Sequence, residues 1–304
     1  MSTRLAMGMS LKLLIVGVCI GIVFQKFYGF GRVLHAVGLD YELIQAWTET
    51  ARGKRTQVPL SVLDSKKRMM VALVFGQSNS SNSGETPKAA ATDAVYNYYR
   101  GQLYRAEDPL LGADGKGGSV WTRLGDRLIE RNLHDAVVFV ALGIKDSEIA
   151  RWQPSGDLHQ SILDVIQDLK NHRLSITHLL WHQGESDALL KTDGDTYKRM
   201  FLDMLASIRR QGVEAPIFVS IATRCGKNRG EPSLQRAQSE LINNAQMIYP
   251  GPNTDMLGLA YRMDGCHFAD EGLDEAARLW LEALEASPKS DEVVQQVGQG
   301  QRLN

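Results

Sequence analysis

The chain has 304 residues, of which 43% are hydrophobic, so it can form one large or two small folded domains and is not wholly disordered. Its formal net charge of −1 gives no electrostatic reason to expect a nucleic acid as partner. The three cysteines, Cys19, Cys225 and Cys266, have no metal-ligand spacing, so no metal site is predicted.

The N-terminal region is predicted to anchor the chain in a membrane. Residues 13–24 form an uninterrupted apolar run, and neighbouring apolar residues extend it toward the roughly 20 needed to cross a bilayer if Lys12 and Lys26 reach the membrane surface. No small-residue cleavage site follows, which favours an uncleaved signal anchor over a removed signal peptide. We expect one transmembrane helix within residues 1–31, with a buried core helix as the alternative. Basic residues flank both ends and leave the orientation open, but a signal anchor puts the following domain outside the cytoplasm, in the periplasm or cell envelope.

The next segment is expected to connect this anchor to a folded domain. Apolar side chains recur at broadly helical spacing over residues 33–52, so residues 32–65 are predicted to form a helical stalk or linker. The folded domain is expected over residues 66–286. The polar residues 287–304 are expected to form a disordered tail.

From residue 69 onward, strand-like and helix-like patterns alternate. The expected strands are continuous apolar runs, as in parallel strands covered on both faces, at 69–75, 136–142, 176–182, 217–222 and 256–260. The expected helices cover about 121–131, 157–172, 195–211, 231–247 and 271–286. This alternation predicts an α/β fold, a doubly wound three-layer α/β/α sandwich around a parallel sheet. Residues 76–120 are expected to form a long polar connection, which beside a site is more often functional than structural.

Three short motifs follow expected strands and contain the candidate chemical groups. The sequence GQSN occupies residues 76–79, WHQGESD occupies residues 181–187, and DGCHF occupies residues 264–268. Because α/β proteins place their sites beyond the carboxyl ends of parallel strands, these motifs are expected to meet at one edge of the sheet.

Ser78 is the candidate nucleophile, although a serine at this place also suits a simple cap of the next segment. A serine hydroxyl needs an adjacent base, and His267 is the best candidate among the seven histidines. Asp264 precedes His267 by three residues, so its carboxylate can accept a hydrogen bond from the Nδ1 of His267. The Nε2 of His267 then remains free to take the Ser78 proton. Read alone, this Asp-x-x-His pattern also fits a surface turn.

Together the three motifs resemble those of the SGNH-hydrolase superfamily, and within it the sialate O-acetylesterase-like carbohydrate esterases, a group that includes acetyl xylan esterase-like proteins. The resemblance covers about residues 68–286. It implies a flavodoxin-like fold and a catalytic triad of Ser78, His267 and Asp264, without metal or organic cofactor. It also implies three oxyanion donors: the Ser78 N–H, a backbone N–H after the second strand, and the Gln183 amide.

The second oxyanion donor is where the chain departs from the family pattern. Relatives usually carry a Gly-Gly-(Ser/Thr) stretch before a tryptophan, whereas residues 143–152 of this chain read GIKDSEIARW. Gly143 is the only glycine in that stretch and is the expected donor. Alignment on Ile149-x-x-Trp152 would instead put Lys145 or Asp146 in the glycine position.

Two further residues of the second motif are expected to support the site. Glu185 is expected to support the loop by accepting backbone N–H groups, with contact to His267 as a second carboxylate as the alternative. His182, at a strand end, is expected to be structural rather than catalytic.

Four further residues, three of them outside the motifs, are candidates for roles at the site. Trp152 is a candidate substrate-binding wall, because aromatic faces suit pyranose rings, and a core or rim role is equally open. Arg236 begins an Arg-x-Gln sequence that resembles an element of these esterases and is expected to brace the motif loops. Cys225 and Cys266 both follow expected strands, and either a disulfide or two independent thiols fit the sequence.

The resulting prediction is a membrane-anchored serine esterase that removes O-acetyl groups from sialate or another acetylated glycan through an acetyl-enzyme. The expected partners are the acetylated carbohydrate and, through the N-terminal helix, a membrane, but no nucleic acid. One alternative is a broader lipase- or thioesterase-like SGNH hydrolase. The other is a catalytically weak carbohydrate-binding relative, favoured only by the altered 143–147 segment.

Overall fold

The computed structural model describes residue 48 and residues 51–287. The chain divides into two units, Met1–Glu49 and Thr50–Asn304, and the second unit contains the α/β fold. The predicted anchor and the expected tail beyond residue 287 lie outside the described residues. Within the described part of the chain, no helix is both long and apolar enough to cross a membrane.

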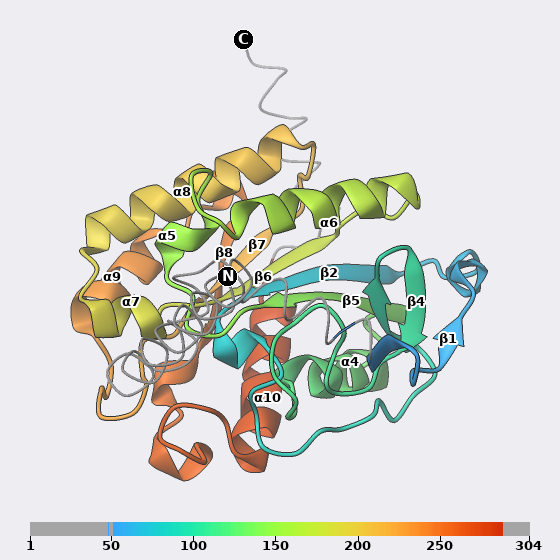
Figure 1. Cartoon of the computed structure of the whole chain (residues 1–304), viewed down its shortest axis with the longest axis horizontal. Coiled ribbons are helices and arrows are strands. Elements are labelled where there is room, and N and C mark those ends of the chain that lie inside the picture. Colours follow the sequence, from blue (N-terminus) through green and yellow to red (C-terminus); the bar gives the residue numbers. More distant parts are fainter. Residues whose placement is uncertain (1–47, 49–50, 288–304) are drawn as a thin grey trace, which may run out of the picture. The chain divides into compact units, whose positions relative to one another are not determined.

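A mixed sheet forms the centre of the second unit, and the described residues contribute eight strands to it (Figure 1). The strands lie in the order β1-β4-β3-β5-β2-β6-β7-β8. From β3 to β8 the neighbours run parallel, whereas β4 and β1 extend one edge in antiparallel fashion. The bounds are β1 Gln57–Val58, β2 Met69–Gly76, β3 Val95–Tyr99, β4 Gln102–Arg105, β5 Ala136–Gly143, β6 His178–His182, β7 Ile217–Ile221 and β8 Ile248–Asn253.

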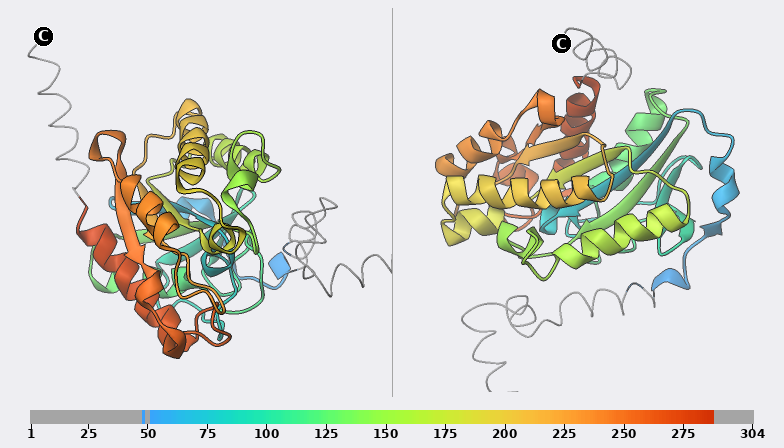
Figure 2. Two further views of the ribbon diagram at one scale, coloured as in Figure 1. Left: turned by 90° about the vertical axis from the view of Figure 1, so that its left-hand side faces the viewer. Right: turned by 90° about the horizontal axis from the view of Figure 1, so that it is seen from above.

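Helices cover both faces of this sheet. Figures 1 and 2 show α4 and α10 on one face and α6 and α8 on the other. The α-helices of the described residues are α4 Val120–Glu130, α5 Ile149–Trp152, α6 His159–Asn171, α7 Glu185–Leu190, α8 Gly194–Arg210, α9 Pro232–Glu240 and α10 Asp270–Glu285. The 3-10 helices are η1 Leu60–Leu63, η2 Ser78–Ser80, η3 Asn244–Gln246, η4 Thr254–Met256 and η5 Leu259–Tyr261. The predicted α/β class, with helices on both faces of a largely parallel sheet, is therefore confirmed.

The central strand β2 explains where a site can form. In chain order, the strands β5-β2-β6-β7-β8 have the arrangement 2-1-3-4-5 that is typical of flavodoxin-like sheets. Ligand sites in such sheets lie beyond the carboxyl ends of the strands, where the connections leave to opposite sides. The carboxyl ends of β2, β5 and β6 are in register, with Gly76 opposite both Gly143 and His182. The GQSN and WHQGESD motifs therefore meet at this edge.

Packing in the core follows from the apolar character of the parallel strands. From Met70 to Gly76, every residue of β2 is buried, because both of its faces are covered by helices. The Phe75 ring packs edge-on against Trp181, at 4.8 Å between centroids, and against Trp152, at 6.1 Å. Aromatic pairs in this geometry add to the free energy gained from burial alone.

The predicted last strand, at residues 256–260, is wrong. Residues 254–261 form the short helices η4 and η5, and the strand is β8, Ile248–Asn253. The β8 sequence Ile-Tyr-Pro-Gly-Pro-Asn resembles a turn because its two prolines cannot donate to a ladder. They are tolerated because β8 is the edge strand and pairs only with β7.

The long connection after β2 is more regular than expected. Within residues 76–120, the strands β3 and β4 form a hairpin joined by Arg100 and Gly101. Both joining residues have positive φ, 46° and 73°, as a two-residue hairpin turn of this handedness requires. The aromatic-rich sequence of β3, Val-Tyr-Asn-Tyr-Tyr, is the strand signal in this segment.

Two other boundaries differ from the predicted ones. Strand β1, at Gln57–Val58, pairs with β4, so part of the expected 32–65 linker belongs to the sheet and the folded domain begins before residue 66. The helix expected over 231–247 ends at Glu240, and η3 follows, with the Asn243 side chain accepting from the Ala245 N–H. Asparagine favours such local caps over helix continuation.

Candidate active site

Ser78 lies directly beyond the carboxyl end of the central strand β2, two residues after Gly76. Gly76 has a φ of 130°, and a Cβ at this position would clash with the His182 carbonyl of the neighbouring strand β6. This close approach lets the Gln77 N–H donate to the same carbonyl at 3.1 Å. Ser78 then begins the helix η2, where a first-turn N–H has no partner within the helix. Its backbone N–H is thus positioned as a donor at the carboxyl edge of the sheet.

Asp264 and His267 form the hydrogen bond that their spacing predicts. The Nδ1 of His267 lies 2.6 Å from Asp264 Oδ2, and the backbone N–H groups of His267 and Cys266 donate to Asp264 Oδ1 at 2.7 and 2.8 Å. Burial opposes ionisation of Asp264, but these three donors outweigh it and hold its pKa below the usual value. A carboxylate that accepts from Nδ1 fixes the tautomer in which Nε2 of His267 is the acceptor.

The Asn79 side chain joins all three motifs. Its Nδ2 donates to Glu185 Oε1 at 2.7 Å and to the Cys266 carbonyl oxygen at 3.3 Å. The residue after Ser78 is therefore bonded to the residue before His267. Among the described residues, Ser78 and His267 share no hydrogen bond, and such catalytic contacts often shorten only when substrate is bound.

Glu185 is buried and has a partner that the sequence did not indicate. Its Oε1 accepts from the Asn79 side chain, and its own backbone N–H also favours the carboxylate, but it forms no hydrogen bond with His267. Burial raises its pKa to about 7, opposed by the Asn79 hydrogen bond. Glu185 thus connects the WHQGESD motif to the GQSN motif through Asn79, and its predicted role in supporting the loop stays a prediction.

Gln183 has a different role from the predicted oxyanion donor. Its Nε2 donates to Asp187 Oδ2 at 2.5 Å and to the Ser147 carbonyl at 3.0 Å, so both amide hydrogens have acceptors. Its Oε1 accepts from the Tyr197 hydroxyl at 3.0 Å. The residue has no exposed surface. In this arrangement Gln183 braces the connection after β5 and leaves no N–H for an oxyanion.

The connection after β5 contains the other predicted donor. Gly143 ends β5, and a Cβ on it would clash with the Ser80 and Ser81 backbone of the serine loop. Three residues later, Asp146 has a φ of 53°, the left-handed conformation in which glycine is usually found. Asp146 therefore has a glycine-like backbone conformation, whereas Gly143 is the glycine that the close approach of residues 80–81 requires.

Side-chain amides of other residues hold the second motif in place. The Oε1 of Gln77 accepts from the Gly184 and Ser186 N–H groups at 3.1 and 3.0 Å. From helix α9, Gln238 donates to the Gln183 carbonyl at 2.9 Å and accepts from the Ala222 N–H at 3.1 Å. Gln77 belongs to the GQSN motif, and Gln238 is the last residue of the Arg-x-Gln element, so both lie in segments that the sequence pattern had indicated.

Two predicted site residues have other positions. Trp152 has 0% of its surface exposed and packs against Phe75 and Trp181, so it belongs to the core and cannot stack on a sugar. Arg236 is exposed on α9 and makes none of the loop-bracing hydrogen bonds, which come from Gln238. In a helix, side chains two residues apart point in different directions, and only one can face the loops.

His182 and the cysteines complete the surroundings. His182 is fully buried, with Nε2 3.0 Å from the Thr254 hydroxyl, and burial lowers its pKa to about 3, so it is neutral and structural. Cys225 and Cys266 form a disulfide, with Cα atoms 4.1 Å apart, which decides between the two possibilities left open by the sequence. Within the described residues, no three His, Cys, Asp or Glu side chains are grouped as metal ligands.

Comparisons with known proteins show the family to which the chain belongs. Residues 68–284 match the family described as carbohydrate esterase, sialic acid-specific acetylesterase. The chain belongs to this family. It is therefore a carboxylic ester hydrolase by family, related to carbohydrate acetylesterases, and the resemblance of the three motifs is confirmed. No curated protein sequence matches the chain.

Two solved structures are similar in fold. One is a protein from Arabidopsis thaliana, with 16% identity and a TM-score of 0.59, over 72% of this chain and 99% of that one. The other is NanS, with 15% identity and a TM-score of 0.52, over 73% of this chain and 98% of that one. At these identities the likeness concerns the fold of the esterase domain.

Proposed function

We propose that this carbohydrate esterase removes O-acetyl groups from an acetylated glycan, with Ser78, His267 and Asp264 as its catalytic triad. The observation that carries the proposal is the Asp264–His267 hydrogen bond, held against the serine loop by Asn79. It supplies an oriented base on a segment that is hydrogen-bonded, through Asn79, to the residue next to Ser78. The family supports ester hydrolysis of a carbohydrate.

In the first half of the reaction, Ser78 Oγ attacks the acetyl carbonyl carbon while Nε2 of His267 takes the hydroxyl proton. Asp264 stabilises the resulting imidazolium through Nδ1, at 2.6 Å. The tetrahedral oxyanion accepts from the Ser78 N–H and from a backbone N–H of residues 143–147. Gln183 keeps those residues in place through the Ser147 carbonyl.

In the second half, the tetrahedral intermediate collapses and the sugar hydroxyl leaves with the proton from His267. Water, deprotonated by the same imidazole, then attacks the acetyl-enzyme and releases acetate and free Ser78. Every proton moves between Ser78, His267 and the reactants, so these steps involve only groups of the chain and water.

The predicted N-terminal anchor suggests where the enzyme acts. A signal anchor within residues 1–31 would attach the esterase to a membrane by a single pass, with its domain outside the cytoplasm. We propose that its substrate is an acetylated glycan of the cell envelope or one imported through it. Sialate is one member of this class, and contacts between the site and the sugar ring decide which acetylated sugar is the substrate.

The test compares wild-type full-length protein with Ser78→Ala in the hydrolysis of p-nitrophenyl acetate and in acetate release from O-acetylated sialic acid and acetylated xylan. We expect Ser78→Ala to abolish hydrolysis at an unchanged melting temperature, because Ser78 lies at the site rather than in the apolar core. The exposed serine of η1 gives a matched control, since Ser61→Ala should retain full activity.

Labelling with a fluorophosphonate separates the alternatives. An active serine should be labelled stoichiometrically at Ser78, whereas a binding protein without an effective base would react poorly. A preference for long-chain acyl esters over acetyl esters would instead favour the lipase- or thioesterase-like alternative. Near-wild-type activity of Ser78→Ala would refute the nucleophile assignment.

A further inference from the structure

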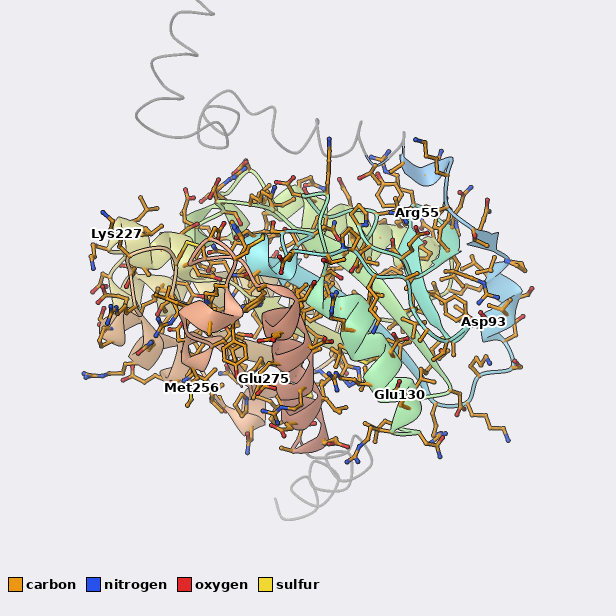
Figure 3. The ribbon with its side chains drawn as sticks, turned by 90° about the horizontal axis from the view of Figure 1, so that it is seen from below. Arg55, Asp93, Glu130, Lys227, Met256 and Glu275 are labelled. Atoms are coloured by element: carbon orange, nitrogen blue, oxygen red, sulfur yellow. A yellow bond between two sulfur atoms is a disulfide. The ribbon has the colours of Figure 1, made fainter. Side chains whose placement is uncertain are left out.

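The segment that contains His267 combines buried and exposed apolar side chains. Residues 254–269 form two short 3-10 helices, and Leu257 and Phe268 are buried in the core, at 4% and 1% exposed. Three other large apolar side chains expose much of their surface: Met256 at 78%, Leu259 at 58% and Met263 at 48%. Figure 3 shows Met256 at the other end of the domain from Arg55. Because few apolar side chains are buried between Leu257 and Phe268, this stretch opens at a lower free-energy cost than the core does. The position of His267 therefore depends on the burial of Phe268 and on a few specific contacts of the stretch before it.

Those contacts converge on Cys266, the residue directly before His267. Its carbonyl oxygen accepts from the Arg262 guanidinium and, at 3.3 Å, from the Asn79 amide. Arg262 is buried and also donates to two other carbonyls of the same segment. The backbone position of Cys266 sets the point from which the His267 side chain extends.

The sulfur of Cys266 provides a covalent tie to a different part of the chain. It is bonded to Cys225, which lies 41 residues earlier in the connection between β7 and α9. Beside this bridge, the Gly226 N–H donates to the Gly265 carbonyl at 3.0 Å. The disulfide and this hydrogen bond clamp the two loops together next to His267.

The Cys225 side of the bridge is firmly held. The N–H groups of Thr223 and Arg224 each donate to Asp255 Oδ1 at 2.7 Å, and Gln235 of α9 donates to Asp255 Oδ2 at 2.6 Å. Asp255 is buried but belongs to the same 254–269 segment as His267, so these hydrogen bonds also tie the start of that segment to the loop of Cys225. The disulfide therefore adds a second tie between the two connections, next to His267.

We propose that Cys225 is a positioning residue: through its disulfide to Cys266 it holds His267 within reach of Ser78, and hydrolysis depends on the oxidation state of this pair. The proposal rests on the proposed function. A dithiol reduces the bridge with two electrons, so the S–S bond breaks, each sulfur gains a proton, and the dithiol closes to a cyclic disulfide. The Asp264–His267 hydrogen bond does not cross the bridge, so reduction displaces the pair relative to Ser78 without separating it.

The experiment uses the full chain, purified in a non-ionic detergent, before and after treatment with dithiothreitol. Alkylation followed by mass spectrometry counts free thiols at Cys225 and Cys266, and far-UV circular dichroism verifies that the protein stays folded. Because misplacement of a base lowers the rate of the chemical step, we expect kcat for p-nitrophenyl acetate to fall by about 10- to 100-fold with KM changed by less than about 2-fold. Reoxidation with diamide should restore kcat.

Variants separate this inference from the proposed function. Cys225→Ser should have the low kcat with and without dithiothreitol, whereas Cys19→Ser, the matched control, should retain full activity and full sensitivity. The wild-type cycle of reduction and reoxidation decides the question even where Cys225→Ser fails to fold.

Three results would overturn the proposal. The first is free thiols at Cys225 and Cys266 before reduction, and the second is an unchanged kcat after verified reduction of an active enzyme. Either of these two results would leave the proposed function intact. An oxidised wild-type protein that hydrolyses none of the acetyl esters would overturn the proposed function and this inference with it.

Discussion

The buried carboxyl of Glu185 gives the sharpest prediction about stability. Replacing Glu185 by glutamine keeps the side-chain shape and the oxygen that accepts from Asn79 at 2.7 Å, but removes the ionisable group. The variant should therefore differ from the wild-type protein mainly in how its free energy of unfolding depends on pH.

The magnitude follows from the pKa of Glu185, which burial raises from 4.5 to about 7. Below pH 4.5 the carboxyl is protonated in both the folded and the unfolded chain, and its contribution to stability is fully present. As pH rises toward 7, the unfolded chain releases the proton while the folded chain retains it, so folded wild-type protein loses stability. This difference in pKa between the folded and the unfolded chain corresponds to a loss of about 3 kcal/mol in the free energy of unfolding of the wild type. Glu185→Gln has no ionisable group here and does not lose this stability.

The assay is urea unfolding of both proteins, with the disulfide intact, at several pH values between 4.5 and 8. The free energy of unfolding of Glu185→Gln minus that of wild type should grow by about 3 kcal/mol across this range, because the other titrating groups cancel in the difference. Glu130→Gln, at an exposed position on α4 that Figure 3 labels, is the matched control and should give no pH-dependent difference.

A constant difference between Glu185→Gln and wild type from pH 4.5 to 8 would refute the argument that Glu185 is buried and neutral in the folded protein. A difference that shrinks with rising pH would mean that the folded chain favours the ionised carboxylate, for example through the buried Arg262.

Three further predictions concern the triad, the core and the anchor. Steady-state kinetics of Asp264→Asn should give a kcat lower by about 10³-fold or more, and His267→Ala should lose more activity than Asp264→Asn. The double variant should be little worse than His267→Ala, and additive losses would contradict a shared role of the two residues. Denaturant unfolding of Trp152→Ala should reveal a loss of about 3–5 kcal/mol with KM unchanged, whereas a raised KM at normal stability would restore Trp152 to the substrate site. Full-length protein should sediment with membranes and resist carbonate extraction, and release by carbonate would argue against the predicted helix within residues 1–31.

Local sequence patterns sufficed for the class of fold and for the family to which the chain belongs. Continuous apolar runs identified β2, β5, β6 and β7, because strands that are buried on both faces have apolar residues at every position. The same logic failed for β8, whose prolines fit only because it lies at the edge of the sheet. The Asp264–His267 hydrogen bond could be predicted because three residues within one turn are local in space as well as in sequence.

Contacts between distant segments could not be deduced in this way, since nothing local determines them. Asn79 pairs with Glu185 across 106 residues and with Cys266 across 187. The burial of Trp152, the capture of the Gln183 amide by Asp187 and the bridge from Cys225 depend likewise on how helices and loops close over the sheet. Sequence alone therefore determined which residues could act, through local spacing and apolar periodicity. Only the tertiary structure decided which of them are buried and which partners they have, because burial and hydrogen-bond geometry are set by segments that meet after folding.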